Sequence, residues 1–142
     1  MANCLRAFLL AGIVAVMAAC LSACEYIPTS ASELIDSDTI AVRAEATASD
    51  TFATNAKGTL EVTADWTVAS NNVDIFIARG SGSCTAEALK NRSCDVVGSG
   101  ESPTAKPESL TIANLAAGTY TLHVVNSGAA ADTVSCHIVL TH

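Results

Sequence analysis

The chain has 142 residues, which suits one domain with an appendage, and only 4% of them are aromatic, so the core has to be built from aliphatic side chains and alanine. Seven Lys and Arg residues stand against 14 Asp and Glu residues and form no basic stripe. This acidic balance excludes nucleic acid from the expected partners, because affinity for phosphates depends on clustered cations.

The chain begins with a segment typical of protein export. Arg6 precedes an uncharged apolar run over residues 7–23 (AFLLAGIVAVMAACLSA). A basic start followed by an apolar stretch is the anatomy of a signal peptide, and this stretch is too short and too rich in alanine for a comfortable transmembrane helix. We therefore expect residues 1–23 to be a signal peptide.

The sequence LSAC at residues 21–24 resembles a bacterial lipobox. The resemblance implies cleavage before Cys24 and a membrane anchor made by lipid, palmitate included, on this residue. Several acyl chains, at about 0.8 kcal/mol per buried methylene, make such an anchor stable. Because Glu25 rather than aspartate follows, resemblance to lipoproteins of bacteria with two membranes favours the outer membrane, on either face. The alternatives are cleavage before Cys20 and an ordinary secretory signal with an incidental Cys24.

Residues 24–37 hold the lipidated cysteine and a predicted flexible tether, since they contain Pro28 and several Ser and Thr without a sustained period. The domain is predicted over residues 38–142. Residues 39–47 (TIAVRAEAT) indicate a first strand, although their alanine content also allows a helix.

Two alternating segments follow. Residues 59–68 (TLEVTADWTV) have one apolar and one polar face, as in a sheet with one solvated side, and Trp66 lies on the apolar face. Residues 73–78 (VDIFIA) come after a Ser-Asn-Asn turn and carry Asp74 inside an otherwise apolar strand.

The next segment, residues 80–94, is irregular, with one helical turn predicted at residues 85–90. A short strand is predicted at residues 95–97. Residues 98–107 form a long polar loop with two prolines.

Residues 108–126 (ESLTIANLAAGTYTLHVVN) predict a strand, a tight corner and a second strand. Leu115, Gly118 and Tyr120 match a tyrosine corner, in which the hydroxyl turns back onto the preceding backbone. Residues 132–141 alternate again as a last strand. Together these elements predict an all-β domain, a single antiparallel β-sandwich of jelly-roll or immunoglobulin-like type with about seven strands.

Two stretches, LEVTADWTVASNNVDIFIARG and PESLTIANLAAGTYTLHVVNSG, resemble the bacterial pre-peptidase C-terminal (PPC) domain, with a core at about residues 50–141. The resemblance implies a jelly-roll-like β-sandwich. Such domains are often appended to secreted peptidases and sometimes bind polymeric substrates. Here the module has no peptidase domain beside it in this sequence, so the resemblance bears on the fold more than on the function.

Cys84 and Cys94 bracket the irregular segment and are expected to pair in an oxidising envelope. Closure of so short a loop stabilises the fold by roughly 2.5–3 kcal/mol in the chain-entropy model. The alternative is a metal or redox site, which the lack of a C-x-x-C motif and of a nearby histidine disfavours. Cys136, on the apolar face of the last strand, is expected to be a small buried hydrophobe.

Two sets of residues are candidates for metal binding, although the sequence favours neither. If the last two strands form a hairpin, His123 faces His137 across it, and the pair is a candidate zinc site. The other set is a candidate Ca²⁺ site formed by Asp74 with Asp65, Asn71 and Asn72. The alternatives are two exposed strand histidines and a hydrogen-bonded carboxylate.

No catalytic motif is present: there is no G-x-S-x-G, no H-E-x-x-H and no phosphate-binding glycine loop. We therefore expect a non-catalytic, lipid-anchored module of the cell envelope that binds or adheres to a glycan or protein through the loops at residues 79–94 and 98–107. A glycan site there would depend on Arg79, Lys90 or Arg92. The alternative is a structural or accessory subunit of an envelope assembly.

Overall fold

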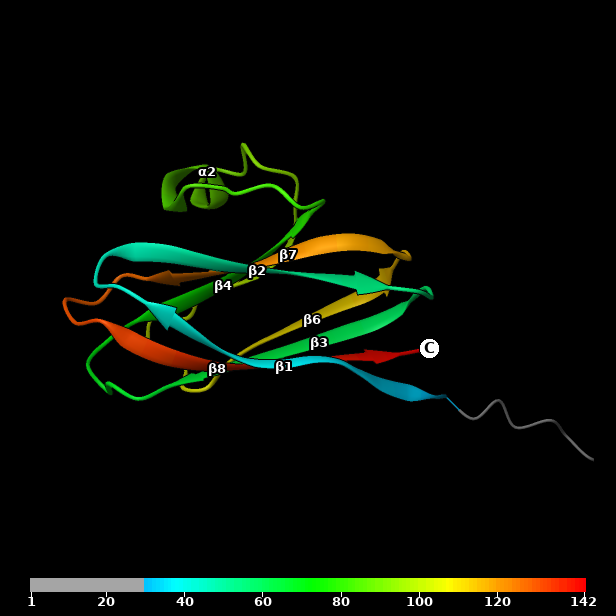
Figure 1. Cartoon of the computed structure of the whole chain (residues 1–142), viewed down its shortest axis with the longest axis horizontal. Helices are drawn as coiled ribbons and strands as arrows, with labels where there is room; N and C mark the ends of the chain where they lie inside the picture. Colours follow the sequence, from blue (N-terminus) through cyan, green and yellow to red (C-terminus); the bar gives the residue numbers. More distant parts are fainter. Residues whose placement is uncertain (1–29) are drawn as a thin grey trace, which may run out of the picture.

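Eight antiparallel strands and one short helix make up residues 30–142, the part of the chain that the computed structural model describes (Figure 1). The strands are β1 (Ser32–Val42), β2 (Ala46–Thr54), β3 (Gly58–Trp66), β4 (Val73–Arg79), β5 (Val96–Gly100), β6 (Glu108–Leu115), β7 (Gly118–Asn126) and β8 (Asp132–Thr141), and the helix is α2 (Ala86–Lys90). No helix in this part is long and apolar enough to cross a membrane. The predicted signal peptide and Cys24 lie outside the described residues.

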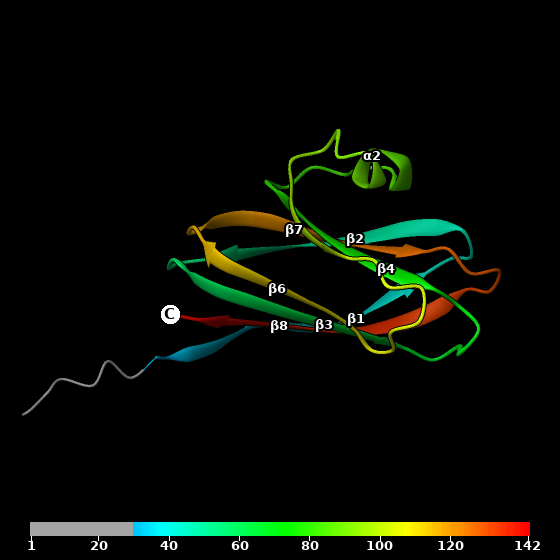
Figure 2. The same cartoon turned by 180° about the vertical axis from the view of Figure 1, so that it is seen from behind.

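The strands form two four-stranded sheets, with the orders β1-β8-β3-β6 and β2-β7-β4-β5. The two sheets stack face to face, which confirms the predicted β-sandwich with eight strands in place of about seven (Figure 2). Consecutive strands lie in opposite sheets except for β4 and β5. Almost every turn therefore carries the chain across the sandwich instead of closing a hairpin.

The core lies between the sheets and is made by the alternating side chains that the sequence pattern predicts. Trp66 is 5% exposed and belongs to this core. The other fully buried members share an aliphatic or aromatic character; the largest are Leu60, Val62, Ile75, Ile77, Tyr120, Leu122, Ile138 and Leu140.

The first strand begins earlier than its sequence indicates. β1 starts at Ser32, inside the predicted tether, and Ser32 is the register partner of Thr141 in β8. Backbone hydrogen bonds join Ala31 and His142 in both directions, at 2.8 and 2.9 Å. An edge strand can be held by backbone hydrogen bonds to one neighbour, without an alternating apolar pattern. The sequence of residues 32–37 therefore does not indicate a strand.

The strand predicted at residues 39–47 is also divided. A turn over residues 43–45, with Glu45 at a φ of 50°, separates β1 from β2 and sends the chain into the other sheet. The prediction of one uninterrupted strand over residues 39–47 was therefore wrong at its C-terminal end.

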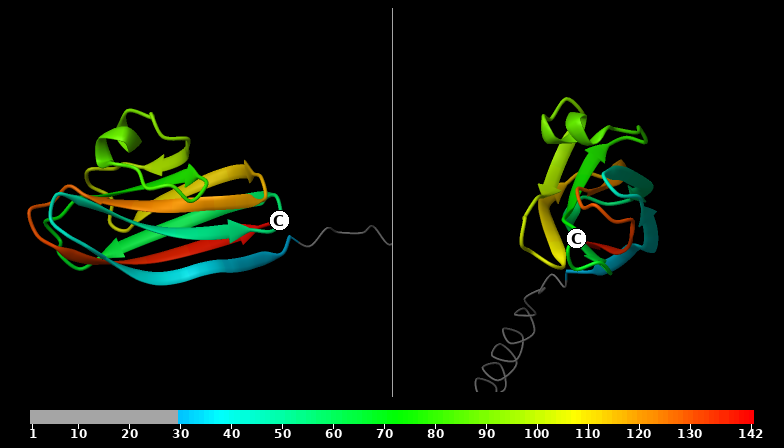
Figure 3. Two further views of the ribbon diagram at one scale, coloured as in Figure 1. Left: turned by 45° about the horizontal axis from the view of Figure 1, so that its top comes forward. Right: turned by 90° about the vertical axis from the view of Figure 1, so that its left-hand side faces the viewer.

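Both ends of the described chain lie at the same end of the sandwich (Figures 1 and 3). The connections at residues 55–57 and 116–117 share this tether end. The connections at residues 43–45, 67–72, 101–107 and 127–131 lie at the opposite end. The two groups of loops lie at opposite ends because successive strands run in alternating directions.

Tyr120 has the geometry of a tyrosine corner. Its hydroxyl donates a hydrogen bond to the Ala116 carbonyl at 2.8 Å, and its ring is fully buried and stacks on Phe52 with 5.9 Å between centroids. The Gly118 N–H donates to Thr54 Oγ1 at 3.2 Å, which ties the corner to the end of β2. Leu115 is 4% exposed at the start of the same corner. The corner thus fixes the passage from β6 in one sheet to β7 in the other.

We expect Tyr120→Phe to lower the free energy of unfolding by about 1–2 kcal/mol, because the Ala116 carbonyl loses its hydroxyl donor. Chemical denaturation of the full chain in detergent measures the change. Thr119→Val is the matched control: this exposed neighbour keeps a β-branched side chain, and the change should stay below about 0.5 kcal/mol. Equal losses in the two variants would contradict the role assigned to the hydroxyl.

Candidate functional site

Within residues 30–142, the only connection between consecutive strands of one sheet joins β4 to β5, and it is also the longest connection. Residues 80–95, which we call the insert, fold over the outer face of the β2-β7-β4-β5 sheet, and α2 lies above that face (Figures 1 and 2). Thr85 caps the helix by accepting a hydrogen bond from the Ala88 N–H at 3.2 Å. The predicted helical turn is confirmed, with its helix spanning Ala86–Lys90.

The predicted disulfide closes the insert. Cys84 and Cys94 are bonded, with 6.5 Å between their Cα atoms. This crosslink constrains a segment that would otherwise have few interactions of its own.

A second, smaller apolar cluster lies between the insert and the sheet. Phe76 of β4, Leu89 of α2 and Val125 of β7 are its buried members. Both cysteines of the disulfide pack against it, together with Ala86 and Val96. The insert is therefore docked on the sheet by burial of apolar surface as well as by its crosslink.

Ion pairs add to this docking. Lys90 Nζ of the helix lies 3.2 Å from Asp74 Oδ2 of β4, whose side chain is 6% exposed. Asn72 donates to the other oxygen of Asp74 at 3.2 Å. Arg79 Nε pairs with Asp95 Oδ2 at 3.3 Å on the exposed side of the insert. Asp74, which interrupts the apolar pattern of its strand, thus forms the ion pair between the sheet and the helix.

Arg92 ends the helical turn and connects the insert to β5. It has a φ of 60°, and its guanidinium lies 5.7 Å from the Phe76 ring centroid. The same guanidinium donates to Ser99 Oγ at 2.7 Å and to Glu101 Oε1 at 2.9 Å. The guanidinium is therefore held in place by a hydroxyl, a carboxylate and an aromatic ring.

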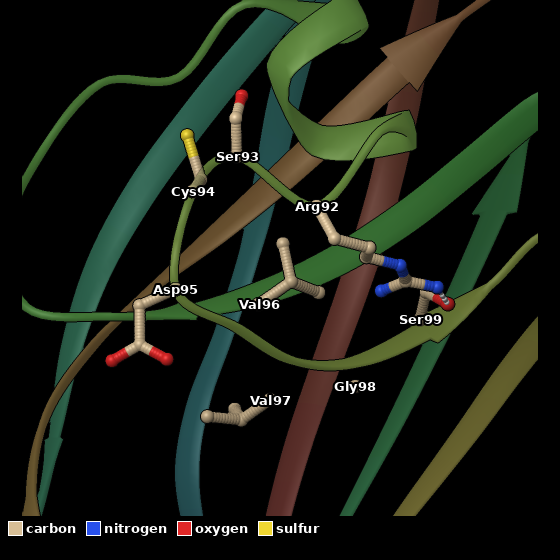
Figure 4. A pocket seen from close by; sticks show the side chains of 8 residues that line it. All are labelled: Arg92, Ser93, Cys94, Asp95, Val96, Val97, Gly98 and Ser99. Atoms are coloured by element: carbon tan, nitrogen blue, oxygen red, sulfur yellow. Dashed lines mark hydrogen bonds between the residues drawn. The ribbon is translucent and has the colours of Figure 1, made fainter.

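An open hollow of about 680 Å³ is lined by residues 92–99, between the end of the insert and β5 (Figure 4). Figure 4 shows the Arg92 side chain reaching toward Ser99, whereas Asp95 lies on the other side at the start of β5. The hollow combines one cation, one carboxylate, hydroxyls and the side chains of Val96 and Val97. This mixture suits contact with a polar surface and offers no nucleophile with an adjacent base.

His123 lies in the sheet beneath the insert, on the outward side of β7. Its side chain is fully buried, and neither ring nitrogen has a hydrogen-bond partner among residues 30–142. Burial lowers the pKa of its imidazole. Across the strands, His123 faces Ser49 of β2 and Phe76 of β4.

The predicted pairing of His123 with His137 is wrong. β7 and β8 belong to different sheets, so no hairpin joins them, and His137 faces Ser37 and Thr63. The Nδ1 atom of His137 lies 3.0 Å from Ser37 Oγ at the surface of the sandwich. The structure therefore does not bring the candidate zinc ligands together.

The candidate calcium ligands are also dispersed. Asp65 is on β3 in one sheet, where its Oδ1 lies 3.8 Å from Lys106 Nζ, whereas Asp74 is on β4 in the other. Asn71 donates to Asp132 Oδ2 at 2.9 Å, and of the candidate calcium ligands only Asn72 contacts Asp74. Within residues 30–142, no three His, Cys, Asp or Glu side chains gather closely enough to hold a metal ion.

Asp132 accepts hydrogen bonds from several groups of the β3–β4 connection, a role that the sequence pattern did not predict. It begins β8 and accepts hydrogen bonds from Thr67 Oγ1 at 2.7 Å and from the Thr67 and Val68 N–H groups. Although burial by itself raises its pKa, the hydrogen bonds from Thr67 and Asn71 outweigh that effect and hold the pKa of this carboxyl well below its usual range. A turn-type Asn at residue 71 was the one sequence signal for this network.

The aromatic side chains of the described residues are all in the interior. Phe52, Trp66, Phe76 and Tyr120 are each 7% exposed or less. Lys106 covers the Trp66 ring at 5.2 Å from its centroid and donates to the Trp66 carbonyl. No aromatic face in residues 30–142 is therefore presented for stacking on a sugar.

Cys136 is a free, buried cysteine, as its position on the apolar face predicts. Burial, followed by the nearby carboxylates of Asp36, Asp38 and Asp50, raises the pKa of its thiol to about 12. A thiol that stays protonated at neutral pH is a poor nucleophile, so Cys136 is a packing residue.

No protein-family model matches this chain, and no curated protein is similar to it in sequence. The resemblance to the pre-peptidase C-terminal domain and the lipoprotein assignment stay predictions.

We expect Lys90→Met to lower the free energy of unfolding by about 1–2 kcal/mol, because the buried Asp74 carboxylate loses its cation and keeps only Asn72. Denaturant unfolding at neutral pH measures the loss. Lys57→Met, at an exposed turn between β2 and β3, is the matched control and should change stability by less than about 0.5 kcal/mol.

A second substitution tests the pairing itself. In the Lys90→Met background, Asp74→Asn should recover part of the loss, since a neutral amide tolerates burial better than an unpaired carboxylate. Strictly additive losses would show that the two side chains do not stabilise each other.

Proposed function

We propose that this protein is a non-catalytic, lipid-anchored β-sandwich module of the cell envelope, held in the outer membrane through Cys24, that binds an envelope or extracellular glycan or protein. The observation that carries the proposal is the disposition of the chain ends. The described chain enters the sandwich at one end, and four of its connecting loops lie at the other. An anchor preceding residue 30 would therefore hold those loops away from the lipid surface.

The contact surface we propose consists of the insert, its hollow and the loop at residues 101–107, which is the predicted loop at residues 98–107 without the three residues that belong to β5. Polar and charged side chains line the hollow, and function on sandwiches is commonly placed on loops outside the sheets. Arg79, Lys90 and Arg92 lie here, each paired with a carboxylate. A partner would meet a nearly neutral, hydrogen-bonding surface rather than a basic one.

A structural or accessory subunit of an envelope assembly is the second candidate. The burial of every aromatic side chain in residues 30–142 favours it over a sugar-binding role, because sugar binding commonly uses an exposed aromatic face. Protein–protein contact makes no such demand, since a polar loop surface can be complemented by hydrogen bonds and water.

The anchor is tested by Cys24→Ala. We expect the unchanged chain to partition into the detergent-soluble membrane fraction and to incorporate labelled palmitate, and the variant to lose both properties. Because Cys24 precedes the described domain, the variant should keep its thermal unfolding midpoint. A Cys20→Ala variant is the control and should stay in the membrane fraction. Palmitate incorporation that depends on Cys20 instead would move the anchor and contradict this assignment.

The contact surface is tested by partner capture from detergent-solubilised membranes, combined with a glycan array. We expect Arg92→Ala to weaken capture roughly tenfold, equivalent to about 1.4 kcal/mol, because the hollow loses its cation. Lys57→Ala, at the tether end, should leave capture unchanged.

The form of the captured partner separates the two candidates. A glycan signal that depends on Arg92 supports the binding module, and a stoichiometric protein complex without a glycan signal supports the envelope subunit. Capture that is lost in Lys57→Ala and kept in Arg92→Ala would contradict the proposed surface.

A further inference from the structure

The covered face of the β4–β7 pair contains three polar side chains, and the insert satisfies only two of them. Thr121 Oγ1 donates to the Gly80 carbonyl at 2.7 Å. Asp74 is paired with Lys90. His123, between them on β7, is fully buried with both ring nitrogens unpartnered within residues 30–142. A buried polar ring without hydrogen bonds is costly, and such exceptions call for a physical reason.

The position of His123 identifies what covers it. Tyr120, Leu122 and Val124 point into the core, so the alternation of β7 places His123 on the outer face. Phe76, directly across from it, and Val125, two residues on, pack against Leu89 of the insert. The insert is the part of residues 30–142 that lies over this face (Figures 1 and 2). Its docking is therefore what keeps water from His123.

The charged groups around this face do not offer the imidazole a partner. On β4 the nearest acid in the outward row is Asp74, which Lys90 and Asn72 already contact. On β2 the residue opposite is Ser49, which is uncharged. From the insert, Arg92 lies over Phe76 and is bonded to Glu101, and Asp95 pairs on the exposed side with Arg79 of β4. The remaining insert acid is Glu87, in the exposed first turn of α2. A proton on His123 would have no counter-ion among these groups.

We propose that the insert is an acid-released lid: protonation of His123 undocks residues 80–95 from the β4–β7 face and uncovers the apolar cluster of Phe76, Leu89 and Val125. The disulfide keeps the released segment as a closed loop, so opening is local and reversible. This inference goes beyond the proposed function and needs neither the lipid anchor nor a partner.

The direction follows from linkage between protonation and docking. Docking holds the pKa of His123 below its ordinary value, so the docked form is stabilised at neutral pH and loses that stability as pH falls below about 6.5. For an exposed imidazole with a pKa of about 6.5, the ratio of the protonated to the neutral form is roughly 10 at pH 5.5 and roughly 100 at pH 4.5. These ratios set the largest shift in the docking equilibrium that His123 can cause.

Amide hydrogen exchange on the full chain in detergent micelles, corrected for the intrinsic pH dependence of exchange, measures the opening. Between pH 7.5 and 5.0, we expect the protection of the insert amides to fall by up to roughly 30-fold. The Leu89 and Asn91 N–H groups, which are bonded within the helical turn, report on it. The amides of β3 and β8 should keep their protection, which separates local opening from global unfolding.

His123→Leu should abolish the acid-dependent loss of protection, because the substitution removes the titrating group and fills the site with apolar atoms. His137→Gln is the matched control, since it removes an exposed histidine of the other sheet, and should keep the loss. An unchanged insert in the parent chain at pH 5.0, or an equal loss of protection in His123→Leu, would overturn the proposal.

If His123→Leu does not fold, the imidazole resonances of the parent chain decide the question. They are assigned with His137→Gln and His142→Gln. Titration of His123 in step with loss of insert protection supports the lid. Titration near pH 6.5 with the insert still protected, or no titration of His123 down to pH 4.5, contradicts it.

Discussion

The β4–β7 pair has to be covered on both faces, and much of the structure follows from that requirement. Residues 73–78 are buried without exception, although only alternate side chains can enter the main core. The other side chains, Phe76 among them, would be exposed if the chain passed directly from β4 to β5. The insert meets this need with Leu89, the disulfide and the guanidinium of Arg92, which lie over the apolar side chains of this face.

Covering the outer face also buries three polar side chains, which differ in the partners that they find. Thr121 bonds to the backbone of the insert, and Asp74 receives an ammonium group from the helix. His123 has no hydrogen-bond partner among residues 30–142. Since the unpaired imidazole is tolerable only while it is neutral, the same docking that stabilises the sheet makes that docking sensitive to protons. Stability and acid sensitivity thus have one structural source.

The path of the chain explains why nearby residues in the sequence end up far apart. Because consecutive strands alternate between sheets, His123 and His137 lie in different sheets, and so do Asp65 and Asp74. The tyrosine corner is one of these passages, with Tyr120 holding the chain as it turns from β6 into β7. An expectation of a hairpin between β7 and β8 rests on the frequency of neighbouring strand pairs, and this sandwich departs from that tendency. The metal sites inferred from such a hairpin or from loop proximity consequently have no assembled ligand set.

The sequence by itself determined the all-β class, the strand positions with a clear period of two, the corner at Tyr120 and the pairing of Cys84 with Cys94. These depend on local alternation, turn residues and short separations, which the order of residues contains. It did not determine where β1 begins, because an edge strand held by backbone hydrogen bonds requires no apolar pattern. Only the tertiary structure decided which strands are neighbours, that Lys90 pairs with Asp74, and that His123 is buried without a partner in the described part of the chain. Those outcomes depend on contacts between segments distant in the chain, and alternation places a side chain on a face without saying what will cover it.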